Sequence, residues 1–264
     1  MKIGFIDYYL DEWHANNYPR LLAEASSGEM EVANVYALID SPLPGGRTTA
    51  QWCADMKIPA CATVEELIEK SDVLVVLSPD NCEMHEQLCQ LPLRSGKRTF
   101  IDKTFAPDGA TAQRIFDLAD AYHTPCYSTS ALRFAAEYQG IDKQTLQAIT
   151  SWGPGSYETY AIHQLEPILM LMETKVERVL YLPGKDYCSM ALAFEDGRIA
   201  TLACYAKGSP FTLNLCADSG NRVVTAESDY FRAFIAELVQ FFRTGEVRGA
   251  GLLAQQQPGQ WLTV

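Results

Sequence analysis

The first half of the chain alternates between two hydrophobic patterns. Short, continuously apolar runs indicate buried strands, and longer stretches with apolar residues every three or four positions indicate helices. Strands separated in this way by helices are typical of a parallel sheet covered on both faces. Residues 1–130 are therefore predicted to form an α/β, Rossmann-like doubly wound domain. Its expected strands cover residues 2–6, 32–39, 73–77, 98–101 and 126–129, and its expected helices cover 18–25, 48–56, 64–70, 82–94 and 110–122.

The pattern changes near residue 150. Trp152-Gly153-Pro154-Gly155 is expected to break the chain, and a helix is expected to follow through Ile168–Met172. After it come strand-like segments joined by turn signals, and a final amphipathic helix. Residues 131–264 are therefore predicted to form a smaller α+β domain with a mostly antiparallel sheet, whereas 249–264 show no clear period. The expected strands cover 176–182, 188–194, 199–205, 211–217 and 222–225, and the final helix covers 230–243.

Composition narrows the possible partners and the compartment. The chain has 264 residues and a formal net charge of -12, which argues against a nucleic acid as partner. It has neither a signal-peptide pattern nor an apolar stretch of about 18 residues that could span a bilayer, so no membrane association and a cytoplasmic location are expected. The 8 cysteines form no C-x-x-C pair and are expected to be buried free thiols, and no metal site is predicted.

Lys103 is the first candidate for chemistry. The apolar run Val73–Leu77 ends at Ser78-Pro79, and the next run, Thr99–Ile101, is followed by Lys103. If the two strands are parallel neighbours, both carboxyl ends open on the sheet edge where ligands bind in such folds. Lys103 would then face a cleft, although a lysine at a strand end is also often a solvated charge.

The turn after the first strand argues against ordinary dinucleotide binding. A doubly wound domain that binds a dinucleotide usually carries G-x-G-x-x-G there, so that the pyrophosphate can approach the backbone and a helix N-terminus. Residues 7–14 read DYYLDEWH, with no glycine and three carboxylates that would repel a pyrophosphate. Asp40, after the second strand, stands where an acidic residue would hold ribose hydroxyls, or it is a turn or cap residue ahead of Ser41-Pro42.

Several spacings resemble those of a known family. Ser78-Pro79-Asp80, His85, Gly96-Lys97 and Asp102-Lys103-Thr104 resemble the T-P-N, H, G-K and E-K-P landmarks of the Gfo/Idh/MocA family of NAD(P)-dependent sugar and inositol dehydrogenases. The segment 160–168 is similar to that family's glycine-histidine segment, and Arg133-Phe134 is similar to its Y-R-F element.

The resemblance implies roles for individual residues. It implies that Lys103 and His163 are the catalytic pair, and that Lys103, Glu166 and Arg133 contact substrate. Oxidising a carbinol needs a base for the hydroxyl proton and a nearby cation, which histidine and lysine can supply. The cofactor would be NAD or NADP, with NAD favoured because no arginine follows Asp40. The residues expected to bind it are Tyr8, Trp13, Asp40, Ser78, Pro79, His85 and Asp102.

The chain also departs from the family pattern. Asp102 replaces a glutamate, Thr104 a proline, and Thr159 the aspartate usually found four residues before the histidine. Its length is below the family's usual length. Because a proline is tolerated in the first helical turn, Pro167 is expected near the start of the Ile168 helix, with His163 on the approach to it. His163 could then be a capping or packing residue, and Glu166 could orient it or favour the helix N-terminus.

Three functions remain open on the sequence. The first is an NAD(P)-dependent oxidoreductase acting on CH–OH groups of a sugar, polyol or related hydroxy compound. The second is a catalytically inactive, dehydrogenase-like metabolite-binding or regulatory protein that has lost the cofactor, and a weaker third is a non-redox lyase or hydrolase. A homodimer or homotetramer is expected, because an open antiparallel sheet leaves a face and edges to be covered.

Overall fold

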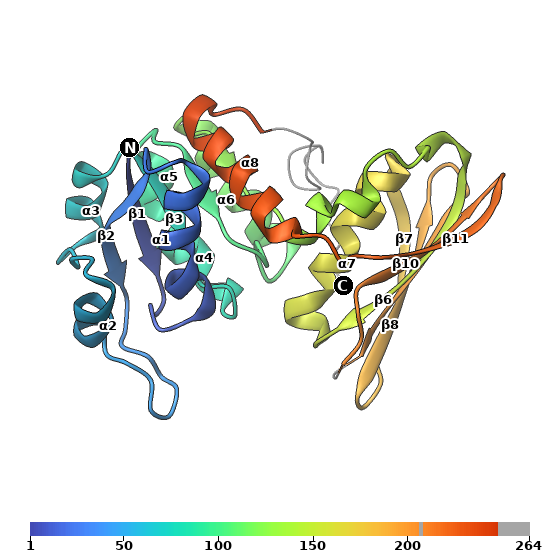
Figure 1. Cartoon of the computed structure of the whole chain (residues 1–264), viewed down its shortest axis with the longest axis horizontal. Helices are drawn as coiled ribbons and strands as arrows, with labels where there is room; N and C mark the ends of the chain where they lie inside the picture. Colours follow the sequence, from blue (N-terminus) through green and yellow to red (C-terminus); the bar gives the residue numbers. More distant parts are fainter. Residues whose placement is uncertain (206–207, 248–264) are drawn as a thin grey trace. The chain divides into compact units, whose positions relative to one another are not determined.

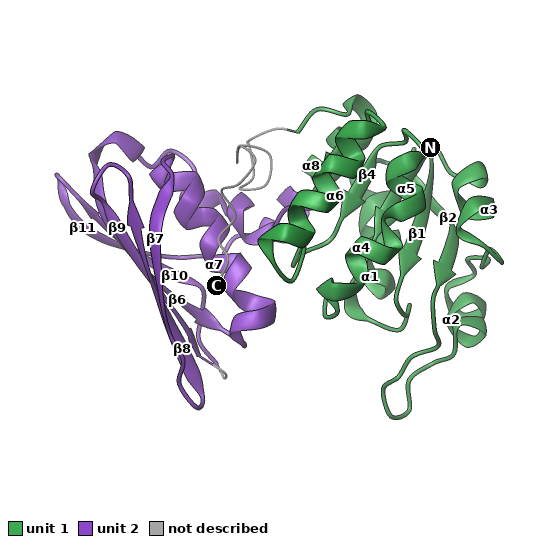
Figure 2. Cartoon of the chain, turned by 180° about the vertical axis from the view of Figure 1, so that it is seen from behind, with its two compact units in different colours: residues 1–128, 235–249 green, residues 129–234, 250–264 purple. Residues whose placement is uncertain are grey.

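The computed structural model describes residues 1–205 and 208–247 (Figure 1). The tail at 249–264, for which the sequence shows no period, lies outside the described residues. Contacts divide the chain into two compact units, coloured separately in Figure 2. Unit 1 contains Met1–Ser128 and the stretch that starts at Ile235, and unit 2 contains Thr129–Phe234.

Unit 1 is built on a five-stranded parallel sheet with the order β2-β1-β3-β4-β5. Helices alternate with its strands along the chain (Figure 1), which confirms the predicted Rossmann-like class. The strands are β1 (Lys2–Asp7), β2 (Glu31–Ala37), β3 (Val73–Val76), β4 (Thr99–Ile101) and β5 (Cys126–Tyr127). The helices are α1 (Trp13–Ala25), α2 (Thr49–Met56), α3 (Val64–Lys70), α4 (His85–Leu88), α5 (Gln90–Arg94) and α6 (Gly109–Ala121), with a 3-10 turn η1 at Cys82–Met84.

The strand order creates a switch point between β1 and β3. The chain leaves β1 toward β2 on one side, and returns to β3 on the other side of β1. In open α/β sheets, ligands bind beyond the carboxyl ends of the strands at such a point. The segments after β1, β3 and β4 are therefore the ones to inspect for a site.

Local chemistry explains two details of unit 1. Gly4 in β1 lets α3 approach closely, because a Cβ there would lie 2.5 Å from Leu67 Cδ2 and 2.5 Å from Ser71 Oγ. The single helix predicted over residues 82–94 is wrong, since the segment forms η1, α4 and α5 in succession. Pro92 has no N–H to donate to the carbonyl of Leu88, where α4 ends, so the chain begins a new turn.

The last helix, α8 (Tyr230–Thr244), begins in unit 2, and its residues from Ile235 belong to unit 1. Arg98 Nη1 donates to the carbonyl oxygen of Phe242 over 2.8 Å, and the ring of Phe241 lies 5.3 Å from that of Tyr127. The end of α8 therefore packs with the β4–β5 side of the first sheet, which the sequence pattern did not indicate.

Unit 2 holds a six-stranded, mostly antiparallel sheet with the order β11-β10-β6-β9-β8-β7. Its strands are β6 (Leu146–Pro154), β7 (Val176–Leu182), β8 (Tyr187–Phe194), β9 (Ile199–Tyr205), β10 (Thr212–Ala217) and β11 (Gly220–Thr225), and its main helix is α7 (Tyr157–Met172). Short 3-10 turns η2 (Ala131–Phe134), η3 (Ala136–Tyr138) and η4 (Lys143–Thr145) precede β6.

The expectation that the strands of this sheet follow one another in sequence order, as an antiparallel meander, is wrong in one respect. β6, which the sequence reading did not include, lies in the middle of the sheet and pairs in parallel with β9. Gly153 and Pro154 resemble chain breakers, but they occupy the end of β6, where a proline costs little.

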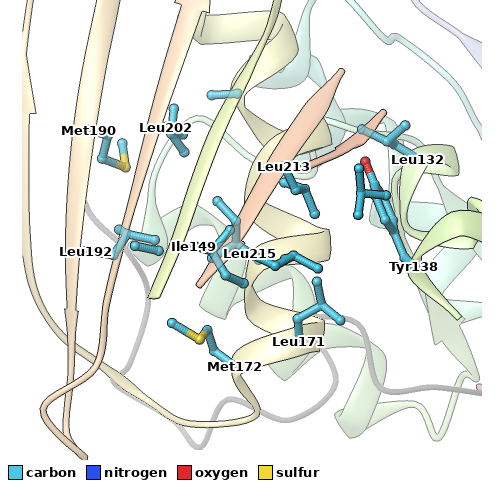
Figure 3. Packing of buried hydrophobic residues seen from close by; sticks show 14 of the residues in the cluster. Leu132, Tyr138, Ile149, Leu171, Met172, Met190, Leu192, Leu202, Leu213 and Leu215 are labelled. Atoms are coloured by element: carbon cyan, nitrogen blue, oxygen red, sulfur yellow. The ribbon is translucent and has the colours of Figure 1, made fainter. Parts of the chain in front are cut away.

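The two faces of the second sheet differ. Along β8, alternate residues are buried and join side chains of α7 and β10 in one apolar core, shown in Figure 3. The register places the exposed large apolar side chains of β7, β8, β9 and β11 on the opposite face. These are Leu180, Leu182, Tyr187, Ile199, Tyr205 and Val223.

Candidate functional site

Lys103 lies at the edge predicted for it. It follows β4, and its Nζ lies 3.5 Å from the carbonyl oxygen of Pro79, in the segment after the neighbouring strand β3. Ser78 has φ of 86° and donates from Oγ to the carbonyl of Asn81 over 3.0 Å. These two features fix the turn that follows β3. The structure therefore brings Lys103, Ser78 and Pro79 together. The Lys103–Thr104 peptide bond is cis.

The buried His85 ring contacts two backbone segments at this edge of the sheet. Its side chain is fully buried, with Nδ1 2.9 Å from the carbonyl oxygen of Phe105 and Nε2 2.7 Å from that of Leu77. Burial lowers the pKa of His85, against the effect of the two carbonyl acceptors. The ring connects the end of β3 with the segment after Lys103, and this position fits a structural role. Its predicted cofactor contact stays a prediction.

The turn after β1 is closed by its own carboxylate. Glu12 is the N-cap of α1, and its side chain accepts hydrogen bonds from the backbone N–H groups of His14, over 2.6 Å, and of Ala15. These are the donors that a helix N-terminus offers to an anionic ligand. Burial raises the pKa of Glu12 to about 7, although His14 opposes the shift.

Asp102 pairs with a histidine of the same turn. His14 Nδ1 contacts Asp102 Oδ2, while Asp102 Oδ1 accepts from the backbone N–H of Lys103 over 2.8 Å. Burial alone would raise the pKa of Asp102, but the contact with His14 outweighs it and the pKa is lowered. The His14 ring also stacks on Tyr18, with centroids 4.9 Å apart and planes at 12°. Asp102 thus joins the end of β4 to α1, and its predicted cofactor contact stays a prediction.

Asp7 adds a second buried acid to this turn. Its Oδ1 accepts from the backbone N–H of Tyr8 over 2.7 Å, but its Oδ2 is buried with no hydrogen-bond partner. Burial raises the pKa of Asp7 well above its ordinary value, and the nearby Glu12 adds to the shift. Burial with no hydrogen-bond donor to Oδ2 disfavours the ionised form of the Asp7 side chain.

The other residues predicted near a nucleotide have ordinary surroundings. Tyr8 is half-buried and Trp13 is 54% exposed, so both belong to the outer side of the first turn. Asp40 is exposed, and its Oδ1 accepts from the backbone N–H of Thr49 over 2.7 Å at the start of α2. This contact agrees with the capping role considered for Asp40.

Arg47 is a residue of this region that the sequence did not suggest. Its Nε donates to Asp11 Oδ1 over 2.9 Å, and its Nη2 donates to Asn16 Oδ1 over 2.6 Å. It therefore ties the first turn and α1 to the loop before α2. Asp11 is neutralised within the chain and its pKa is lowered, chiefly by the hydrogen bond from Arg47.

A dinucleotide held in the usual way does not fit this turn as the structure shows it. The Glu12 side chain accepts from the N–H groups of His14 and Ala15 at the start of α1, and the turn has no glycine that would let a pyrophosphate approach the backbone. Glu12 also interacts electrostatically with Asp7 and Asp102, so the turn holds further acidic groups. A pyrophosphate could reach α1 only if the Glu12 carboxylate left its capping position. No group of three or more His, Cys, Asp or Glu side chains able to hold a metal ion occurs within 1–205 and 208–247.

The second group of predicted residues lies in unit 2, on α7. This helix begins at Tyr157, so the expectation that His163 precedes a helix with Pro167 in its first turn is wrong. The helix starts directly after Gly155, whose φ is 83°, and tolerates Pro167 in its interior. Pro167 cannot donate to the carbonyl of His163, four residues earlier.

His163 has a serine as its neighbour. Its Nδ1 lies 2.6 Å from Ser130 Oγ, and the edge of its ring meets Tyr160 and Phe211 at centroid distances of 5.4 Å and 5.7 Å. Glu166 does not take that place, because its Oε2 accepts from Thr129 Oγ1 over 2.7 Å and from the backbone N–H of Ser130 over 2.9 Å.

Glu166 and Arg133 are both buried. Burial raises the pKa of Glu166 to about 7, with Arg133 as the main opposing influence. The Arg133 guanidinium also lies 5.6 Å from the ring centroid of Phe134. Direct substrate contact by Glu166 and Arg133 stays a prediction, and their observed contacts support the segment that carries Ser130.

Comparisons with known proteins assign the N-terminal part of the chain. Residues 14–129 match the family model described as "Oxidoreductase family, NAD-binding Rossmann fold", of the Gfo/Idh/MocA type. Over these residues, somewhat less than half of the chain, the sequence is similar to the Gfo/Idh/MocA oxidoreductase family. The match begins at His14, directly after the turn that lacks glycine. No significant match was found among curated proteins.

Solved structures extend the likeness over both units, at the level of the fold. UDP-N-acetylglucosamine 3-dehydrogenase GnnA from Acidithiobacillus ferrooxidans has a TM-score of 0.72 at 14% identity, over 94% of this chain and 90% of that chain. Scyllo-inositol dehydrogenase from Lactobacillus casei has a TM-score of 0.72 at 13% identity, over 94% and 89%. Biliverdin reductase from Synechocystis, solved with biliverdin and NADP+, has a TM-score of 0.71 at 13% identity, over 93% and 92%. One fold thus carries substrates of different chemistry, as is common.

Proposed function

We propose that the chain is an NAD(P)-dependent oxidoreductase that acts on the CH–OH group of a sugar, polyol or related hydroxy compound. The observation that carries the proposal is the match of residues 14–129 to an NAD-binding oxidoreductase family, together with Lys103 at the strand-end edge beside Pro79. Several structural neighbours are dehydrogenases of a sugar nucleotide or of inositol, which supports a polyhydroxylated substrate.

In this proposal His163 and Lys103 have different roles. His163 takes the proton of the substrate hydroxyl, and the charge of Lys103 stabilises the developing alkoxide. NAD(P) is the hydride acceptor that the family description implies, with NAD favoured because no arginine follows Asp40.

A direct test combines binding with turnover. NADH and NADPH are titrated into the protein by calorimetry, and a panel of sugars, sugar acids and inositols is then screened for NAD(P)+ reduction at 340 nm. The proposal expects saturable binding of one cofactor and turnover with part of the panel. Absence of binding at millimolar cofactor would refute it.

One observation favours a second candidate, a metabolite-binding protein that works without a nicotinamide cofactor. The Glu12 side chain occupies the N-terminus of α1, and burial raises the pKa of the neighbouring Asp7 well above its ordinary value. This candidate expects a sugar or sugar acid to raise the melting temperature in buffer free of cofactor. Turnover on addition of NAD(P)+ would eliminate it.

We also propose that two copies associate through the exposed face of the second sheet. The face carries Leu180, Leu182, Tyr187 and Tyr205 in neighbouring register positions, and Tyr187 pairs directly with Tyr205. Such a patch is usually covered in an assembly. Sedimentation is expected to show a dimer or tetramer at micromolar concentration, and a monomer alone would contradict this. No helix within 1–205 and 208–247 is long and apolar enough to cross a membrane, and the cytoplasmic location stays a prediction.

A further inference from the structure

Ser130 makes hydrogen bonds through both its side chain and its backbone. It is fully buried and is the N-cap of η2, where its Oγ accepts from the backbone N–H of Leu132 over 3.3 Å. Its own N–H donates to Glu166 Oε2 over 2.9 Å. Both its side chain and its backbone are therefore fixed by contacts within unit 2.

The hydroxyl of Ser130 faces the imidazole of His163. The distance between Ser130 Oγ and His163 Nδ1 is 2.6 Å, short for a hydrogen bond of this type. The two residues are 33 positions apart and come from η2 and α7.

Thr159 cannot be the partner that the family's aspartate would have been. Its Oγ1 lies 3.1 Å from Ser156 Oγ, at the exposed start of α7. A threonine at this position is directed to the helix N-terminus, and the place beside His163 Nδ1 is filled from another element.

A hydroxyl partner has a chemical consequence that a carboxylate lacks. Because Leu132 N–H already donates to Ser130 Oγ, the hydroxyl proton is available for the Nδ1 of a neutral imidazole, which puts the His163 proton on Nε2. When the ring is protonated, the hydroxyl rotates and accepts from Nδ1–H. Ser130 can therefore remain bonded through a cycle in which His163 gains and loses a proton, without favouring the imidazolium as an aspartate would.

We propose that Ser130 is the positioning residue of His163, that it sets the tautomer and the direction of the ring, and that Glu166 and Thr129 hold Ser130 in place. The inference rests on the proposed function for its kinetic consequence only, because the contact itself is a property of unit 2. Among the described residues, the charged or titratable groups around the pair include Tyr160 on α7, Glu166 one turn further along α7, and Arg133 on η2.

The test uses the full chain with Ser130→Ala and Ser130→Thr, and with Ser156→Ala as control, since Ser156 is another hydroxyl of the same unit that contacts Thr159 and not His163. Ser130→Ala is expected to lower kcat by roughly 10- to 100-fold with KM changed by less than about 3-fold, a part of the usual contribution of acid–base catalysis. Because the Ser130 hydroxyl can bond to either form of the ring, the midpoint of the kcat–pH profile is expected to stay within about half a unit of wild type. Ser130→Thr keeps the hydroxyl and should restore most of kcat. Melting curves identify any variant that fails to fold.

A second readout does not depend on activity. Two-bond 1H–15N spectra report the tautomer of each of the 4 histidines, and His163→Asn assigns the signal. Wild type is expected to show Nε2–H for neutral His163, whereas Ser130→Ala should give a mixture. If no cofactor supports turnover, the proposed function fails and the spectra still decide on Ser130. Unchanged spectra in Ser130→Ala, or an unchanged kcat, would overturn the inference.

Discussion

Two buried glutamates, one in each unit, make opposite use of the same chemistry. Burial raises the pKa of both Glu12 and Glu166 to about 7, and each accepts two hydrogen bonds close to a histidine. Glu12 closes the N-terminus of α1, where a dinucleotide-binding domain normally offers its donors to phosphate. Glu166 supports Ser130, which contacts His163. The comparison indicates that contacts within unit 2 hold the partner of His163, the proposed base. The N-terminus of α1, where an anion would bind, is occupied by the side chain of Glu12.

The largest expected effect separates the two histidines. His163→Asn should lower kcat by roughly 10²- to 10⁴-fold, because it removes the proposed general base, and should change stability little. His14→Asn should instead act on stability, since it leaves the buried Asp102 without its partner. The expected loss is about 3 kcal/mol, by analogy with broken buried ion pairs.

Both effects are measurable with one preparation of each variant. Steady-state kinetics gives kcat, and urea unfolding gives the free energy of unfolding. His123→Asn is the matched control, since His123 is an exposed histidine in unit 1. A His14→Asn protein with wild-type stability and no activity would reverse the assignment and place catalysis in the first turn.

The pH dependence of stability tests the pair of glutamates directly. A carboxyl group whose pKa rises from 4.5 to about 7 on folding keeps its proton in the folded state after the unfolded chain has lost it. Stability should therefore fall as pH rises from about 4.5 to about 7, by at most roughly 3 kcal/mol for each glutamate. Asp7, whose pKa is also raised, adds to this fall, whereas the lowered pKa of His85 opposes it below about pH 6.5. Asp102, whose pKa is lowered, acts only below its ordinary value and leaves this window unaffected.

Glu166→Gln is the variant that isolates one of the two. It should be less sensitive to pH between 5 and 8 than wild type, and relatively more stable at pH 8. The exposed Glu69→Gln serves as control. Equal pH dependence of stability in wild type and Glu166→Gln would show that the pKa of Glu166 is not raised in the way described.

The sequence predicted the first unit well, because its strands are continuously apolar and its helices are bounded by turns. It was less informative for the second unit. β6 was missed because Gly153 and Pro154 resemble breakers, and the start of α7 was missed because Pro167 suggests a first turn and lies in the interior.

The candidate sites show a similar division. Lys103, Ser78 and Pro79 could be placed from the order of strands alone, since parallel neighbours end at one edge. Ser130 could not, because its contact with His163 joins residues far apart in the chain, and no local pattern marks a serine for this role. The capping function of Glu12 was not predicted either, because the first helix was expected to begin at Tyr18, whereas α1 begins at Trp13, directly after Glu12.

A smaller effect is expected from removing the cap itself. Glu12→Ala should cost about 1 kcal/mol of stability as the loss of an N-cap side chain, in part offset by removing a buried carboxyl group. Thr63→Ala removes the capping side chain of α3 in the same unit and serves as control. A melting temperature of Glu12→Ala equal to or above that of wild type would contradict this expectation, and so would a loss of folding.

The central claim, an NAD(P)-dependent oxidoreductase with its own carboxylate at the α1 N-terminus, is tested most directly by calorimetric titration of NADH and NADPH into wild type, Glu12→Ala and Thr63→Ala. The account predicts that wild type binds one cofactor with a dissociation constant below about 1 mM, that Glu12→Ala binds it at least about 10-fold more tightly, a gain of about 1.4 kcal/mol, and that Thr63→Ala equals wild type. No binding to wild type at millimolar cofactor, or equal affinity in wild type and Glu12→Ala, would contradict it.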